Sequence, residues 1–129
     1  MILKKAWKYQ KFKMRLEDLD FELEHRIVAF STVTREGRPH TIAVEINRVI
    51  DDRIIITNNQ MNVTPINIKN NSNVSIMFWT DETGFRIEGK AEYYESGEYF
   101  KIVKSLPENK NYKPKGAIVV KVKKIIELG

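Results

Sequence analysis

Short segments rich in β-branched and aromatic residues constrain the fold of this chain most. The clearest is Phe85–Tyr93, in which apolar and charged residues alternate as along a half-buried strand. Gly89 lies on its apolar side, which predicts a β-bulge or a close backbone approach. Five further segments read as strands: 27–34, 39–46, 53–58, 74–80 and 117–128. Six antiparallel strands in a small domain tend to close, because closure removes exposed edges, so the pattern predicts an all-β barrel.

Two or three short helices are expected beside these strands. The first is expected over 16–25, where leucines recur at near-helical spacing. The second is expected to start at Thr64 and Pro65, with Thr64 as the N-cap and Pro65 as the first helical residue. The third is expected over 96–106, with Ser96 as its N-cap.

Length and composition limit the class of protein. A chain of 129 residues forms one domain with one core. It has no cysteine, which excludes disulfides and thiolate metal sites and fits a reducing compartment. No apolar run approaches the ~18 residues of a membrane span, and the N-terminus lacks the apolar core of a secretory signal. We therefore expect a cytoplasmic protein without a membrane-spanning segment.

The positive charge is concentrated in the first fifteen residues. Residues 1–15 contain six lysines and arginines and no acid, whereas the whole chain has a net charge of +5. We interpret 1–15 as a basic N-terminal arm and 16–129 as the folded domain. A second concentration of lysines lies between Lys110 and Lys124. Solvated surface is the preferred interpretation, and the alternative is a nucleic-acid-binding small barrel that uses the aromatic-interleaved arm.

Conventional catalytic motifs are absent from the sequence. It has no Walker loop, G-x-G-x-x-G, G-x-S-x-G or H-E-x-x-H pattern. His25 and His40 are the only histidines, and we expect neither a metal site nor a catalytic side chain. The best candidate for binding chemistry is the polar end of strand 53–58, which leads to the helix start at Thr64. A helix N-terminus presents free N–H groups and a positive dipole end, so it can hold a phosphate; ordinary capping is the alternative.

Five segments together resemble the FMN-binding split barrels of the pyridoxamine 5'-phosphate oxidase family. They occur in the family's order, and their combined spacing is more specific than any one of them. The segments are 29–33 with 36–40, 51–57, 64–68 with 70–76, 84–92 with 96–100, and 117–122. The resemblance implies a six-stranded antiparallel Greek-key split β-barrel.

The resemblance also implies where FMN would lie. Residues along the flavin ring would be Ile42, Ala43, Val44 and Glu45. The ribityl chain and phosphate would meet Thr57, Asn58, Asn59 and Gln60, with Thr64 holding the phosphate. Members of the family commonly have a basic residue just before this threonine, but here that residue is Val63. Arg38, Lys69 or a lysine of the arm are the candidates to replace its charge.

A homodimer with flavin sites at the subunit interface is the assembly that the resemblance implies. The partner would cover Trp79, Phe85 and the C-terminal strand, which we expect to be exposed in one protomer. The function implied is that of an FMN-dependent oxidoreductase or electron-transfer protein. A barrel that has lost FMN and binds a deazaflavin or haem is the remaining alternative.

Overall fold

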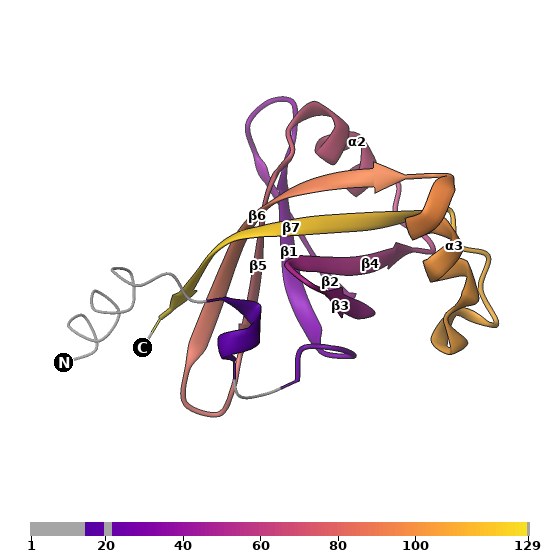
Figure 1. Cartoon of the computed structure of the whole chain (residues 1–129). Coiled ribbons are helices and arrows are strands. Elements are labelled where there is room, and N and C mark those ends of the chain that lie inside the picture. The colour runs from indigo at the N-terminus through magenta and orange to yellow at the C-terminus, as the bar shows by residue number, and fades with distance from the viewer. Residues whose placement is uncertain (1–14, 20–21, 129) are drawn as a thin grey trace.

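The computed structural model describes residues 15–19 and 22–128, and within them the fold is a single mostly-β domain (Figure 1). The strands are β1 (Ile27–Val33), β2 (Pro39–Glu45), β3 (Arg48–Ile50), β4 (Arg53–Asn58), β5 (Asn73–Trp79), β6 (Gly84–Tyr94) and β7 (Gly116–Glu127). The α-helices are α2 (Val63–Asn70) and α3 (Gly97–Ser105), and the 3-10 helices are η1 (Leu16–Asp18) and η2 (Pro107–Asn109). None of the described helices is long and apolar enough to cross a membrane.

All seven strands belong to one antiparallel sheet that curves into a half-barrel, as expected for a split barrel. Its order is β2-β1-β5-β6-β7-β4-β3, so β2 and β3 are the two edges. Asn47, between these edge strands, donates its backbone N–H to the Ile55 carbonyl of β4 at 2.9 Å. This bond extends the β3–β4 pairing by one residue, into the connection that follows β2.

The predicted strand number was wrong, because the sheet has seven strands rather than six. The additional strand is β3, which pairs with β4 through a two-residue turn at Asp51 and Asp52. Three residues are too few to show an alternating pattern, so the strand before the turn could not be recognised.

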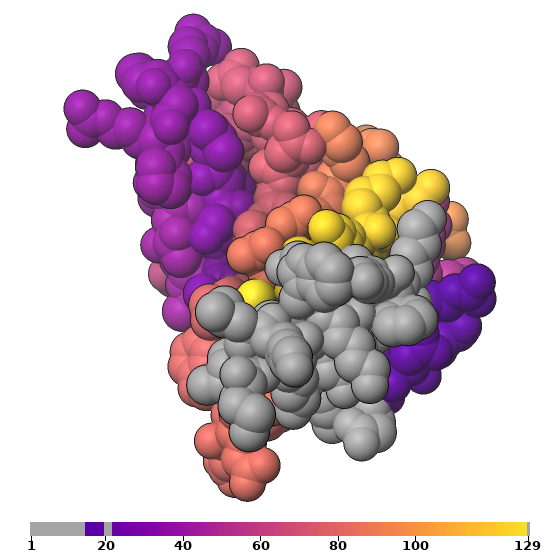
Figure 2. Space-filling model, turned by 90° about the vertical axis from the view of Figure 1, so that its left-hand side faces the viewer, coloured from indigo at the N-terminus to yellow at the C-terminus, as the bar shows by residue number. Residues whose placement is uncertain are grey.

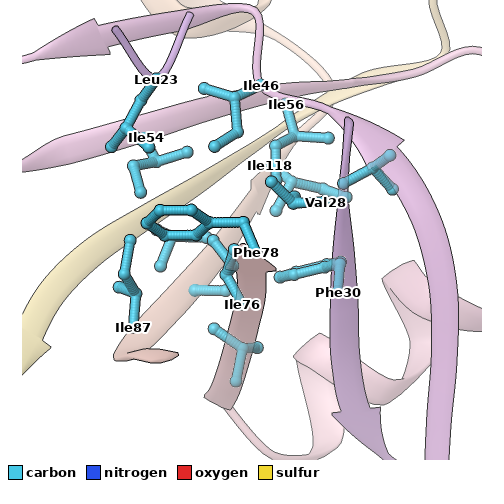
Figure 3. Close-up of a cluster of buried hydrophobic side chains, with 14 of the residues drawn as sticks. Leu23, Val28, Phe30, Ile46, Ile54, Ile56, Ile76, Phe78, Ile87 and Ile118 are labelled. Carbon is cyan, nitrogen blue, oxygen red and sulfur yellow. The ribbon is translucent and has the colours of Figure 1, made fainter. Parts of the chain in front are cut away.

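The core lies on the concave side of the sheet (Figure 3). Figure 3 shows Phe30 and Phe78 among isoleucines contributed by β4, β5, β6 and β7. Phe85 was expected to be exposed but is only 7% exposed, because its ring stacks on Phe78 at a centroid distance of 5.2 Å. Trp79, on the other face of β5, is 62% exposed as expected.

Strand β7 is not an edge strand, because it is paired with β6 on one side and with β4 on the other. Covering of its outer face by a second subunit stays a prediction. The predicted irregularity at Gly89 is confirmed, since the β6–β7 register shifts between Glu88 and Gly89.

The helices differ from expectation at their starts. Over 16–25 the described residues contain only the 3-10 helix η1. Helix α2 begins at Val63 with Asn62 as its N-cap, so Thr64 is the second helical residue rather than the cap. Ser96 precedes α3 in extended conformation, but its side chain makes no capping hydrogen bond. Helix α3 packs its buried residues on Ile55 and Ala117, on the opposite side of the sheet from the main core.

Candidate functional site

A pocket of about 690 Å³ lies where β2, the end of β4, the start of α2 and the η2 segment meet. Residues from four parts of the sequence therefore share one cavity. Its lining residues are His40, Ile42, Ala43, Val44, Glu45, Asn47, Thr57, Asn59, Gln60, Met61, Asn62, Val63, Thr64, Glu108, Asn109 and Tyr112. The volume is within the usual range for pockets that bind small molecules and cofactors.

The structure brings nearly all the residues predicted for the cofactor site to this pocket. Those that line it are Ala43, Val44, Glu45, Thr57, Asn59 and Thr64. Asn58 does not line it: its Nδ2 atom donates to the Tyr93 hydroxyl at 2.8 Å, and its Oδ1 atom accepts from the Met61 backbone N–H at 2.6 Å. Asn58 thus holds the loop that leads to α2, and cofactor contact by the lining residues stays a prediction.

The start of α2 forms one end of the pocket. Asn62 makes no side-chain capping bond to the helix. Val63 is 45% exposed, whereas Thr64 is only 1% exposed. The first N–H groups of a helix have no partner within it, so they can donate to an anion at this end.

A lysine far away in the sequence supplies a positive charge to the same helix start. The Lys115 Nζ atom donates to the Asn62 Oδ1 atom at 3.1 Å, and its backbone N–H donates to the Asn58 carbonyl at 2.7 Å. Lys115 was not among the candidates named from the sequence. No local signal identifies it, because its position depends on the alignment of β7 beside β4.

The candidate cations named from the sequence lie elsewhere. Neither Arg38 nor Lys69 lines the pocket. The Lys69 Nζ atom pairs with Glu95 at 3.4 Å and lies 5.4 Å from the centre of the Tyr93 ring. The lysines of the arm precede the described residues. Among the described cations, Lys115 is therefore the one bonded to the helix cap.

Buried polar side chains form a hydrogen-bonded chain along one wall. The Asn47 Oδ1 atom accepts from the backbone N–H and from the hydroxyl of Thr57, each at 2.8 Å. The Thr57 hydroxyl oxygen accepts from the Asn109 Nδ2 atom at 2.9 Å. Asn109 Oδ1 in turn accepts from Asn59 Nδ2 at 3.3 Å. Such a network fixes the side chains that face the cavity.

This chain of bonds ends in an acceptor without a partner, the buried Oδ1 atom of Asn59. The orientation of the Asn59 amide follows from Asn109, whose Nδ2 atom already donates to Thr57 and to the Val103 carbonyl. Only the Asn109 oxygen remains for Asn59, so the Asn59 nitrogen must face it. A buried acceptor without a donor is costly, and a ligand with an O–H or N–H group would satisfy it.

Acidic side chains lie at another part of the pocket wall. The Glu45 Oε2 atom is 2.9 Å from His25 Nδ1, and the Glu108 Oε2 atom is 3.7 Å from the same nitrogen. Arg48 Nη1 contacts Glu108 Oε2 at 2.8 Å, and Asn47 Nδ2 donates to that oxygen at 3.2 Å. The His25, Glu45 and Glu108 atoms lie within 4.8 Å of one another, so they are the described residues nearest to a metal-binding geometry. Arg48 already balances the charge of Glu108.

Hydrogen bonding sets the protonation of Glu108. Its burial acts to raise the pKa of the carboxyl. Hydrogen bonds from its own backbone N–H, from Arg48 and from Asn47 outweigh burial, and the pKa is lowered from its usual value of 4.5. Glu108 is therefore ionised at neutral pH. The role of this cluster could not be predicted, because it joins residues from three distant segments.

Comparisons with known proteins give the family of the chain. The family described as pyridoxamine 5'-phosphate oxidase matches residues 16–129. An uncharacterized protein of Methanocaldococcus jannaschii is 33% identical over 118 residues, which cover 87% of this chain and 79% of that protein.

Solved structures give the same fold. A variant of HupZ from Group A Streptococcus is 27% identical with a TM-score of 0.75, covering 87% of this chain and 97% of that one. An FMN-binding protein from Syntrophomonas wolfei is 23% identical with a TM-score of 0.68, covering 99% of this chain and 86% of that one. The match over the whole described domain shows that the chain belongs to the pyridoxamine 5'-phosphate oxidase family.

Proposed function

We propose that this protein binds FMN in the pocket and acts in the cytoplasm as a homodimeric oxidoreductase or electron-transfer protein. The observation that carries the proposal is the pocket itself, which joins an anion-binding helix start to an apolar strand and to an unsatisfied acceptor. The description of the Syntrophomonas wolfei neighbour as FMN-binding supports it. Bound flavin would supply the redox chemistry, and the protein would bind and orient it.

The start of α2 fits a phosphate group. Thr64 offers a hydroxyl, the first helical N–H groups offer donors, and Lys115 lies against the helix cap. Lys115 thus compensates for the aliphatic side chain of Val63. A charge-assisted hydrogen bond contributes about 1.5–3 kcal/mol, so one well-placed cation restores most of what Val63 lacks.

The other lining residues fit a flat ring with polar groups. Ala43 and Val44 of β2 offer apolar contact, and Tyr112, which follows η2, also lines the pocket. The Asn59 Oδ1 atom needs a donor, and the ribityl hydroxyls and ring N–H of a flavin are donors of this kind. The residues present therefore fit FMN.

An exposed apolar strip on β1 and β5 supports the homodimer. Ala29 faces Met77 in the β1–β5 register, which places Ile27 beside Trp79 on the same outer face. Ile27 and Trp79 are each 62% exposed and Met77 is 42% exposed. The strip continues through Ala29 toward β2, whose Ala43 lines the pocket. A second copy covering this strip would also wall the pocket.

The dimer is tested by sedimentation of a double variant, Met77→Ser with Trp79→Ser. We expect the native protein to sediment as a dimer and this variant as a monomer, because the apolar strip loses its two largest side chains. Ile66→Ser is the matched control, since Ile66 is 59% exposed on α2 and outside the strip. A monomeric native protein, or equal dissociation of both variants, contradicts the proposed interface.

The cofactor is tested by the visible spectrum of the untreated purified protein. We expect the absorption of an oxidised flavin, or quenching of flavin fluorescence when micromolar FMN is added to colourless protein. Mass spectrometry of the released cofactor then identifies FMN. A haem or deazaflavin spectrum contradicts the FMN assignment, and so does colourless protein that leaves FMN fluorescence unchanged.

A further inference from the structure

A row of positive charges crosses the outer face of β4, β7 and β6. Arg53 faces Lys121 in the β4–β7 register, and Lys121 faces Lys90 in the β6–β7 register. Lys123 follows two residues after Lys121, at the bulge where it has no partner on β6. The neighbouring residues Val120 and Val122 point into the core, so the lysines point outward. We name Arg53, Lys90, Lys121 and Lys123 the cationic row.

The row concentrates like charge where a sheet normally pairs opposite charges. Like charges directly opposite each other destabilise a sheet, so the arrangement has a cost in the free protein. Within the described part of the chain, Arg53 pairs with Asp52 at 2.8 Å, while Lys90, Lys121 and Lys123 have no ion-pair partner. An anionic ligand would relieve this repulsion.

The row lines a groove of about 420 Å³ that ends in two aromatic rings. The Tyr94 and Tyr99 rings lie at a centroid distance of 5.2 Å, and both side chains line the groove. Glu92 is the one acid among the lining residues, and it already accepts the Tyr94 hydroxyl at 2.6 Å. Cations in a track with aromatic rings beside them hold the phosphates and bases of single-stranded nucleic acid.

The described chain also begins next to this face. Arg15 lines one hollow of about 530 Å³ together with Lys123 and Val122. Three acids share the hollow, Glu17, Asp51 and Asp52; of these, Glu17 pairs with Arg15 and Asp52 with Arg53. The preceding fourteen residues lie outside the described structure. Their sequence holds five lysines, three aromatic residues and no acid.

We propose that the cationic row and the adjacent Tyr94 and Tyr99 rings bind single-stranded nucleic acid, with the cations on its phosphate backbone. None of the four residues of the row lines the flavin pocket, so this activity is separate from FMN binding. The sequence alone favoured a solvated surface, because it did not show that residues from three strands would align into one row. Figure 2 shows the yellow surface of β7 against the orange surface of β6, apart from the projecting purple turn between β1 and β2.

Fluorescence anisotropy of a labelled single-stranded oligonucleotide with the full chain tests the proposal. We expect affinity to fall steeply with KCl, with a log–log slope near −3 if about four phosphates are neutralised. Lys90→Gln with Lys121→Gln should flatten the slope by about 1.4. A duplex of equal length should bind more weakly, because its bases cannot reach the tyrosines.

The matched control is Arg35→Gln with Arg38→Gln, in the turn between β1 and β2. It removes the same charge from exposed residues outside the groove, and it should leave the slope unchanged. The Lys90/Lys121 variant should unfold at the same temperature as native protein or higher, since it loses like-charge repulsion. The proposal is overturned if the oligonucleotide does not bind at low salt. It is also overturned if the Lys90/Lys121 and Arg35/Arg38 variants lose equal affinity, or if the duplex binds as tightly as the single strand.

Discussion

At the scale of single residues, Asn59 gives the sharpest expectation about ligand contact. Its buried Oδ1 atom has no donor in the protein. We predict that Asn59→Ala weakens FMN binding about two- to tenfold, the usual effect of one hydrogen bond. Asn111→Ala, at an exposed position outside the pocket, should change affinity little. Fluorescence quenching titrations measure both, and equal affinities of the two variants would show that Asn59 does not contact the ligand.

The lowered pKa of Glu108 leads to a prediction of how the free energy of unfolding depends on pH. Its pKa in the folded protein lies below the usual value of 4.5, so the unfolded chain binds more protons as the solution is acidified. Its contribution to stability is therefore present above about pH 4.5 and is lost as the pH falls through the lower folded pKa.

The Glu108→Gln variant tests this expectation by urea unfolding at a series of acidic pH values. Its free energy of unfolding should be lower near neutral pH and should fall less steeply than that of native protein on acidification. Glu82→Gln, at an exposed loop position, is the control. Parallel pH profiles for native protein and Glu108→Gln would contradict the role given to this carboxylate.

At the scale of elements, the sequence predicted those strands and helices that are long enough to show a hydrophobic period. The alternation in β6 predicted its buried face correctly, and Gly89 predicted the irregular register. The strand β3 was missed because three residues show no period. The expected helix over 16–25 was wrong, since spacing of leucines alone does not stabilise a short helix.

The residues of the candidate site were also predicted only in part. Residues of β2 and of the segment after β4 were named through the family resemblance, and the structure brings them to one pocket. Glu108 reaches the pocket, and Lys115 reaches the helix cap beside it, through the packing of distant segments, so both were missed. Phe85 was misjudged because the family resemblance placed it under a partner subunit, although the alternation in β6 places it on the buried face, where it stacks on Phe78.

Gly89 gives a stability prediction at this scale. A Cβ atom there would lie 2.5 Å from the Lys121 carbonyl oxygen, so the two strands must separate to admit it. We predict that Gly89→Ala lowers the free energy of unfolding by about 1–3 kcal/mol. At Gly84 a Cβ atom meets only side-chain atoms at 3.7 Å or more, so Gly84→Ala should cost little. Chemical denaturation compares the two, and equal losses would contradict the close approach at Gly89.

At the scale of the whole molecule, the half-barrel separates two kinds of surface. The pocket opens between the edge strand β2 and the end of β4. The apolar strip on β1 and β5 adjoins β2, whereas the cationic row lies on β4, β7 and β6. Closing the pocket by a second subunit and binding an anion on the cationic row can therefore occur together.

The central claim is that the pocket holds FMN with its phosphate at the start of α2. Parallel titrations with FMN and riboflavin test it most directly, because only FMN carries the phosphate. We predict that native protein binds FMN at least about tenfold more tightly than riboflavin. Thr64→Val and Lys115→Gln should reduce this preference, whereas Thr64→Ser keeps the hydroxyl and should retain it. Equal affinities of the native protein for the two flavins would contradict the account.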